Sequence, residues 1–140
     1  MDIMTPGERS DRMRLIRAAN TKPELAVRRI VYGMGYRYRL HGDDLPGRPD
    51  IVFRKMRKVI FVHGCFWHLH RCPSSRPPRS KLDYWVPKLQ GNAERDKTVR
   101  QRLRRMGWKT LIVWECQLKR IDRLSHRIRV FLEEKAKIVD

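Results

Sequence analysis

The apolar positions in the first quarter of the chain follow a helical period. Residues 7–20 begin with residues typical of a helix start and place Met13 and Ile16 at helical spacing, which predicts a short basic helix. A second start signal follows, with Thr21 as N-cap, a proline in the first turn and Glu24 at the third helical position. This second helix is predicted to end near Gly33, and its apolar stripe comprises Leu25, Val27, Ile30, Val31 and Met34.

The middle of the chain changes to the short apolar runs and the two-residue period of strands. Residues 36–40 alternate, residues 41–44 indicate a turn, and residues 50–53 and 58–62 flank a tight basic turn, which predicts an antiparallel hairpin. Residues 108–114, WKTLIVW, give the strongest strand signal in the chain. Trp108 and Trp114 on this strand are predicted to lie in the core.

Two further helices complete the pattern. Residues 84–106 are charged on most faces and stop at Gly107, whereas residues 120–135 are amphipathic. The apolar face of that last helix comprises Ile121, Leu124, Ile128, Phe131 and Leu132. The element order is α-α-β-β-β-α-β-α, which predicts an α/β or α+β fold with helices packed on a mixed central sheet.

Size and charge narrow the classes of protein and partner. With 140 residues, 41% of them hydrophobic, residues 1–140 are expected to form a single domain with a substantial core. A net charge of +18 favours nucleic acid as partner, ahead of anionic lipid or a merely solvated basic surface. No apolar run reaches the length of a membrane span or of a signal peptide. A cytoplasmic, nucleoid-associated protein without membrane contact is therefore expected.

The stretch 59–72, VIFVHGCFWHLHRC, carries most of the candidate chemistry. A hairpin turn centred near Met56 places Asp50 opposite about Val62, and hence close to His63. If strands 58–62 and 108–114 are parallel neighbours joined by helix 84–106 in a right-handed crossover, Cys65 and Cys116 emerge at one edge of the sheet. Functional sites tend to form at this edge of open sheets.

The spacing of cysteine and histidine indicates a metal site. Cys65, His70 and Cys72, joined by Cys116, offer four soft ligands, a set typical of a structural tetrahedral zinc. In a cytosolic protein, three clustered cysteines also favour a metal over a disulfide framework. The alternative is a set of free buried thiols beside a surface histidine.

A second group of residues suits hydrolysis. Asp50 at a strand start suits a hard cation such as Mg2+, although an isolated aspartate more often caps a turn. His68 is not needed for zinc and can act as a general base, with a plain surface histidine as the alternative. Phe66, Trp67 and Trp85 flank this site and can stack on bases or wedge between base steps, with core packing as their alternative.

Five stretches of the chain carry a family resemblance. RSDRMRLIRAANTKPELAVRR, LPGRPDIVF, VIFVHGCFWHLHRC, YWVPKLQGNAERD and GWKTLIVWEC occur in family order over about residues 8–120. The chain resembles the very-short-patch-repair (Vsr) endonucleases. The resemblance implies a restriction-endonuclease-like fold with a structural zinc. It also implies a Mg2+-dependent nick 5′ to the mispaired thymine of a T·G mismatch, which arises when 5-methylcytosine deaminates.

The resemblance assigns catalytic roles by motif position. Asp50 matches the metal-binding aspartate, and Val62 stands where threonine is expected and its backbone carbonyl binds the metal. His68 matches the general base, with Asp96 supporting it and His63 beside them.

Further matches concern the metals and the DNA. Glu24 matches an acidic residue near the metal waters. The zinc ligands match Cys65, His70, Cys72 and Cys116. The DNA contacts comprise the intercalating Phe66, Trp67 and Trp85, the mismatch-reading Lys88 and Asn92, and the minor-groove residues Met13 and Ile16.

The resemblance also implies partners. The substrate is double-stranded DNA with a T·G mismatch, the protein is a monomer, and it is functionally linked to a DNA cytosine-5 methyltransferase and to mismatch-repair proteins. Two alternatives stay open: a restriction-fold nuclease without mismatch specificity, and a zinc-stabilised DNA-binding protein without catalysis. Asp50 argues against the second, because a carboxylate facing DNA repels phosphate unless a cation lies between them.

Overall fold

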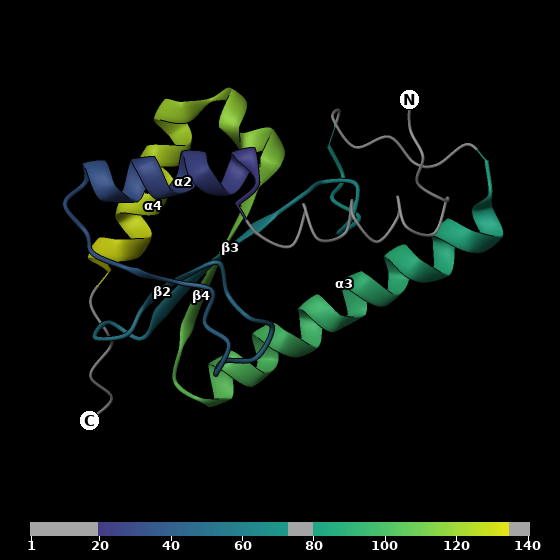
Figure 1. The fold of residues 1–140 in the computed structure, drawn as a ribbon, viewed down its shortest axis with the longest axis horizontal. Coiled ribbons are helices and arrows are strands. Elements are labelled where there is room, and N and C mark those ends of the chain that lie inside the picture. The colour runs from purple at the N-terminus through teal and green to yellow at the C-terminus, as the bar shows by residue number, and fades with distance from the viewer. Residues whose placement is uncertain (1–19, 73–79, 135–140) are drawn as a thin grey trace, which may run out of the picture.

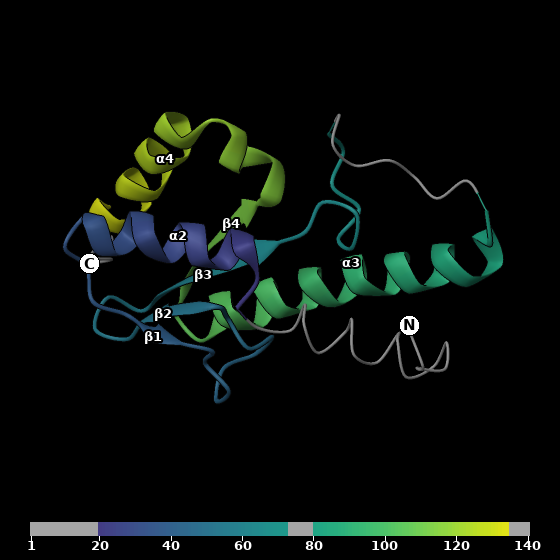
Figure 2. The ribbon, with the colours of Figure 1, turned by 45° about the horizontal axis from the view of Figure 1, so that its top comes forward.

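A four-stranded mixed sheet with helices on both faces forms the body of the protein. The computed structural model describes residues 20–72 and 80–134, so the helix predicted over residues 7–20, with Met13 and Ile16, lies outside the described residues. The strands lie in the order β1-β2-β3-β4. Helices α2 and α4 cover one face, and α3 runs along the other and extends well beyond the sheet (Figures 1 and 2). The predicted mixed α/β architecture is confirmed.

The bounds of the elements agree closely with the sequence pattern. The helices are α2 (Lys22–Gly33), α3 (Leu82–Arg105), the short 3-10 helix η1 (Glu115–Lys119) and α4 (Ile121–Glu133). The strands are β1 (Arg39–Leu40), β2 (Ile51–Phe53), β3 (Lys58–His63) and β4 (Lys109–Trp114). Among the described helices, none combines the length and the apolar character that crossing a membrane requires.

Helix α2 begins as predicted. The hydroxyl of Thr21 accepts a hydrogen bond from the backbone N–H of Glu24 at 3.4 Å, which satisfies one of the unpaired donors of the first turn. Val27 and Val31 are fully buried against the sheet. Leu25, predicted on the same stripe, is 39% exposed.

The strand predicted over residues 36–40 is shorter in the structure. Only Arg39 and Leu40 pair with β2. The backbone N–H of Tyr36 donates instead to the carbonyl of Val31 at 3.3 Å, so the start of this segment belongs to the end of α2.

Strands β2 and β3 form the predicted antiparallel hairpin. Ile51 pairs with Ile60, so continuing the register sets Asp50 level with Phe61, one residue short of the predicted Val62. Strands β3 and β4 are parallel, from Lys58 beside Lys109 to His63 beside Trp114, and α3 is the crossover between them. The prediction that two parallel strand ends meet at one edge is confirmed.

Two apolar clusters hold the sheet between its helices. On one face, α2 and α4 pack against alternate residues of the strands, and the buried members are Val27, Val31, Ile51, Phe53, Ile60, Leu111, Val113, Leu124, Ile128 and Leu132. On the other face, Leu103 of α3 packs against Val59 and Phe61, with Trp108 partly buried beside them as predicted. Ile121, predicted on the apolar face of α4, is 45% exposed because it occupies the first turn.

Candidate active site and metal centre

The edge of the sheet where β3 and β4 end and β2 begins gathers the polar residues singled out by the sequence. His63 and Trp114 are paired at the ends of the two parallel strands. Asp50 directly precedes β2 at the same edge, and its Oδ2 accepts a hydrogen bond from the backbone N–H of Val62 at 2.7 Å. The predicted proximity of Asp50 to His63 follows from this contact.

The carboxyl group of Asp50 is largely shielded from solvent. The pKa of Asp50 is raised to about 7, mainly by burial and also by the neighbouring carboxyl group of Glu24, against the lowering effect of the Val62 N–H. Glu24 comes from the first turn of α2 and is only 3% exposed. Its Oε2 accepts from the backbone N–H of Asn20 at 2.8 Å and from Arg28 at 3.3 Å.

A histidine that the sequence analysis missed completes this group. His41, assigned there to a turn, lies with Nε2 3.9 Å from Oε2 of Glu24. One ligand atom from each of Glu24, His41 and Asp50 lies within 4.8 Å of the others, so the three residues could hold a metal ion. The available signal was the hairpin itself, since residues 41 and 50 bracket a tight loop between two strands.

A second polar group consists of His63, His68 and Asp96. Nδ1 of His68 lies 2.5 Å from Oδ2 of Asp96 on α3, which places the ring proton on Nδ1 and leaves Nε2 as the basic nitrogen. The ring of His63 stacks on that of His68. Burial lowers the pKa of His63 to about 3, with the proximity of His68 adding to the effect, so His63 is neutral at physiological pH.

The four predicted sulfur and nitrogen ligands come together as expected. One ligand atom from each of Cys65, His70, Cys72 and Cys116 lies within 4.8 Å of the others, so this set could hold a metal ion. None of the three cysteines forms a disulfide. Burial raises the pKa of the Cys65 thiol to about 12 and also raises that of Cys116.

Trp114 was predicted to be a core residue, and this prediction is wrong. It is half-buried, and its indole stacks on the ring of His70 with centroids 4.1 Å apart and planes differing by 6°. The same indole meets the ring of His63 edge-on at 5.3 Å. Trp114 thus lies between the cysteine-histidine cluster and the polar group of His63, because it is the last residue of its strand.

The three predicted DNA-contacting aromatic residues form one cluster. Phe66, Trp67 and Trp85 meet edge-to-face with centroids 5.3–5.7 Å apart, and all three are half-buried. Nζ of Lys88 lies 5.8 Å from the ring centroids of both tryptophans. The amide of Asn92 donates to the carbonyl of Trp67 at 3.1 Å, which ties the loop after β3 to α3.

Comparison with known proteins shows the family to which the chain belongs. The family model described as DNA mismatch endonuclease Vsr matches residues 1–74. The type II nicking enzyme V.XorIIP of Xanthomonas oryzae pv. oryzae is 46% identical over 132 residues, covering 94% of this chain and 97% of that protein. The chain belongs to the Vsr family of DNA mismatch endonucleases. The predicted family resemblance and the predicted DNA endonuclease class are therefore confirmed.

Other relatives agree with membership of the Vsr family. The DNA mismatch endonuclease Vsr of Escherichia coli is 40% identical over 124 residues, which cover 89% of this chain and 80% of that protein. The type II nicking enzyme V.NmeAIP of Neisseria meningitidis is 40% identical over 135 residues, which cover 91% and 96%. Membership of an endonuclease family argues against the alternative of a DNA-binding protein without catalysis.

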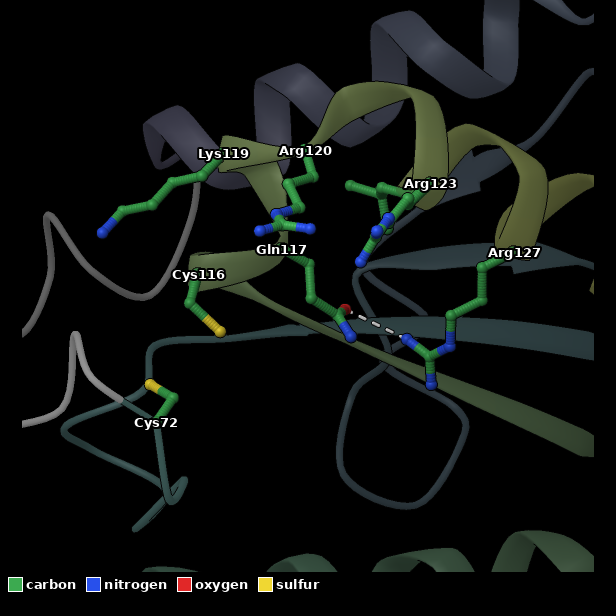
Figure 3. A pocket seen from close by; sticks show the side chains of 8 residues that line it. Cys72, Cys116, Gln117, Lys119, Arg120, Arg123 and Arg127 are labelled. Carbon is green, nitrogen blue, oxygen red and sulfur yellow. Dashed lines mark hydrogen bonds between the residues drawn. The ribbon is translucent and has the colours of Figure 1, made fainter.

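This Vsr-family chain also carries a basic pocket that the sequence analysis did not single out. The basic pocket has a volume of about 440 Å³ and lies beside Cys72 and Cys116, and its cationic lining comprises Lys119, Arg120, Arg123 and Arg127 (Figure 3). Arg127 donates to Oε1 of Gln117 at 3.0 Å and to the carbonyl of Ile112 at 2.9 Å. No carboxylate contributes to the pocket's described lining, so it suits an anion.

Proposed function

We propose that this protein nicks double-stranded DNA 5′ to the mispaired thymine of a T·G mismatch, using Mg2+ for catalysis and a structural zinc for folding. The observation that carries the proposal is the convergence of Asp50 and the His68–Asp96 pair at one sheet edge, beside an aromatic cluster. We place the mixed sheet with its crossover helix among the restriction-endonuclease-like folds, as a single domain acting as a monomer.

The residues present fit both metals. The cysteine-histidine cluster has the closed four-ligand composition of a structural zinc site, and a bound cation would turn its thiols into thiolates. Asp50 offers the carboxylate that a hard cation prefers, and the backbone of Val62 lies beside it in space, since the Val62 N–H donates to Oδ2 of Asp50. The backbone carbonyl of Val62 would be a second oxygen ligand. Glu24 is suited to hold water at the cation.

The chemistry follows from the positions of the side chains. A divalent cation bound at Asp50 would neutralise charge on the phosphate and would lower the pKa of the attacking water. Nε2 of His68 is placed to accept the proton of the water that attacks phosphorus, because Asp96 holds the opposite nitrogen as the donor. The bond from phosphorus to the leaving sugar oxygen breaks as the new bond forms, and that oxygen takes up a proton. His63, buried and neutral, supports the ring of His68 from one side without adding positive charge.

Recognition rests on the face formed by the loop after β3 and the start of α3. Phe66, Trp67 and Trp85 insert beside the mismatch, where a weakened pair makes unstacking less costly. Lys88 and Asn92 read the mismatched pair from the same helix. Met13 and Ile16 contact the minor groove, a role that falls outside the described residues. The basic pocket binds phosphate of the flanking backbone.

Partners follow from the substrate. T·G mismatches form where 5-methylcytosine deaminates, so the protein works alongside a DNA cytosine-5 methyltransferase and the mismatch-repair proteins. Two relatives named type II nicking enzymes support a link to methylation systems.

A nicking assay tests the proposal. Duplexes with one T·G pair, or with T·A at the same position, are incubated with zinc-loaded protein and Mg2+, and the labelled strands are separated on a denaturing gel. A nick 5′ to the thymine in the T·G duplex alone is expected. Equal cleavage of both duplexes would instead identify a restriction-fold nuclease without mismatch specificity.

A further inference from the structure

His41 is held against the catalytic edge by the loop between β1 and β2. Its backbone N–H donates to the carbonyl of Asp50 at 3.2 Å, and that of Gly42 donates to the carbonyl of Pro49 at 3.0 Å. These two bonds close the loop of residues 41–50, so a residue nine positions before Asp50 lies directly beside it. The approach is tight, because a Cβ on Gly42 would lie 2.8 Å from a methyl group of Val52.

The side chain of His41 presents a nitrogen that lacks a hydrogen-bond partner among the described residues. Nε2 is buried and makes no hydrogen bond among the described residues. It faces Oε2 of Glu24 at 3.9 Å, beyond hydrogen-bond distance. A buried polar atom left in this way costs free energy, so a ligand that engages the nitrogen would stabilise the loop.

The backbone of His41 is also unusual. Its φ of 49° lies in the left-handed region, which residues other than glycine seldom occupy. The two hydrogen bonds of the loop hold this backbone conformation and fix the point from which the side chain leaves the chain. The Cα of His41 is therefore held beside Asp50 by the fold itself.

We infer that His41 is a direct ligand of the catalytic cation, together with Asp50 and Glu24. The inference rests on the proposed function in one respect, namely that Asp50 binds that cation. One ligand atom from each of the three residues already lies within 4.8 Å of the others. The ligand set then consists of two carboxylates and one imidazole. In this set Glu24 binds the cation directly, in addition to any water that it holds.

The composition of this ligand set determines which cation it prefers. Mg2+ favours a shell made of oxygen atoms and water, whereas an imidazole nitrogen improves the site for a first-row transition metal. The structure therefore assigns this enzyme a stronger preference for Mn2+ over Mg2+ than a site built on Asp50 and backbone oxygen alone would have.

The other described histidines do not fill this role. His63 and His68 stack on one another, and Nδ1 of His68 is taken by Asp96. His70 belongs to the cluster with the three cysteines. His126 is exposed on α4, which makes it a suitable control position.

Metal binding to the zinc-loaded protein tests the inference without reference to turnover. Mn2+ affinity is measured from the electron paramagnetic resonance of the free ion, and Mg2+ affinity by competition with Mn2+. Pulsed measurements on bound Mn2+ then detect coupling to a nitrogen nucleus. For H41A and H41Q we expect loss of the nitrogen coupling, Mn2+ affinity lower by about 10-fold or more and Mg2+ affinity lower by less than about 3-fold. H41Q keeps a polar side chain of similar length, so it remains informative if H41A folds poorly.

Two controls separate the inference from the proposed function. H126A should match the parent protein in both affinities and in the nitrogen coupling. Asp50→Asn should abolish binding of both cations, and retained binding would refute the metal site of the proposed function. Two results would overturn the role of His41 alone, provided that Asp50→Asn abolishes cation binding. In the first, both His41 variants keep the nitrogen coupling. In the second, their affinities for Mn2+ and Mg2+ fall by the same factor. Parent protein that binds no Mn2+ would overturn both.

Discussion

The imidazole ring of His63 lies flat against that of His68, with centroids 3.7 Å apart and planes differing by 3°. Two stacked imidazoles tolerate one positive charge far better than two, and the buried ring is the one that stays neutral. His68 is held by Asp96 and is about one-quarter exposed, so it is the more accessible ring of the pair. In the proposed function it is the base, and His63 positions its ring.

Neutral His63 makes the folded protein sensitive to acid. Its pKa is about 3 in the folded state and near 6.5 when unfolded, so below pH 6.5 only the unfolded chain takes up this proton. Stability is lost as the pH falls from 6.5 toward 3, by about 2 kcal/mol at pH 5. Denaturant unfolding at pH 7.5 and pH 5 should show a smaller loss for His63→Gln, which carries no titrating ring. An equal loss in both proteins would contradict the buried neutral state.

Asp50→Asn should abolish nicking of a T·G duplex while binding of that duplex survives. The amide keeps the shape of the side chain and removes the charge that attracts the cation, whereas none of the proposed base or phosphate contacts uses this carboxylate. Gel assays of nicking with Mg2+ and of binding without it measure the two effects separately. Near-parental nicking by this variant would mean that the active site lies elsewhere.

Trp67→Ala should have the complementary effect. Loss of the indole removes a stacking surface from the aromatic cluster, and this should weaken binding to a T·G duplex by about 1–3 kcal/mol. Binding to a matched duplex should change less, because no base step is opened there. Fluorescence anisotropy with both duplexes gives the difference, and an equal loss on both would assign Trp67 to general packing.

Cys116→Ser should lower metal content and thermal stability together. Cys116 is the one ligand of its cluster that comes from η1, so a bound zinc joins the end of β4 to the loop after β3. Structural zinc contributes directly to folding free energy. Elemental analysis and thermal unfolding of the same samples measure both quantities, with His126→Ala as an exposed histidine control. Native protein purified without zinc would defeat the assignment.

DNA affinity should fall steeply with salt, with part of the slope traceable to the basic pocket. Each phosphate contact contributes about −0.9 to the slope of log K against log salt. The double variant Arg120→Ala/Arg123→Ala should therefore flatten the slope by about 2 if each arginine contacts one phosphate.

The matched control for the basic pocket removes the same charge at the opposite edge of the sheet. Arg37 and Lys55 are exposed and line a hollow beside the β2–β3 turn, far along the strands from Asp50. Arg37→Ala/Lys55→Ala should leave the slope nearly unchanged. Equal flattening by both double variants would show that net charge, rather than the pocket, sets the salt dependence.

The sequence by itself determined the elements and the parts of the site that lie next to them. The apolar runs of β3 and β4, separated by a long charged helix, favour a parallel pair with a crossover, because a helix of that length can return the chain to the same end of the sheet. Residues such as Cys65 and Cys116 follow those strand ends directly, so their meeting was predictable from chain order alone. The Vsr motifs gave the remaining roles.

Only the tertiary structure shows the environment of residues whose neighbours come from distant parts of the chain. The spacing of the hairpin sets residue 41 near residue 50, but only the closed loop of residues 41–50 and its packing on α2 bring the side chain of His41 beside Glu24. Trp114 ends an apolar strand, and this pattern predicts a core residue. Its ring instead stacks on His70, because the loop after β3 folds back over the end of β4. Local periodicity reports which face of an element is apolar, whereas contacts between distant segments depend on register and loop closure, and these are set only when the whole core packs.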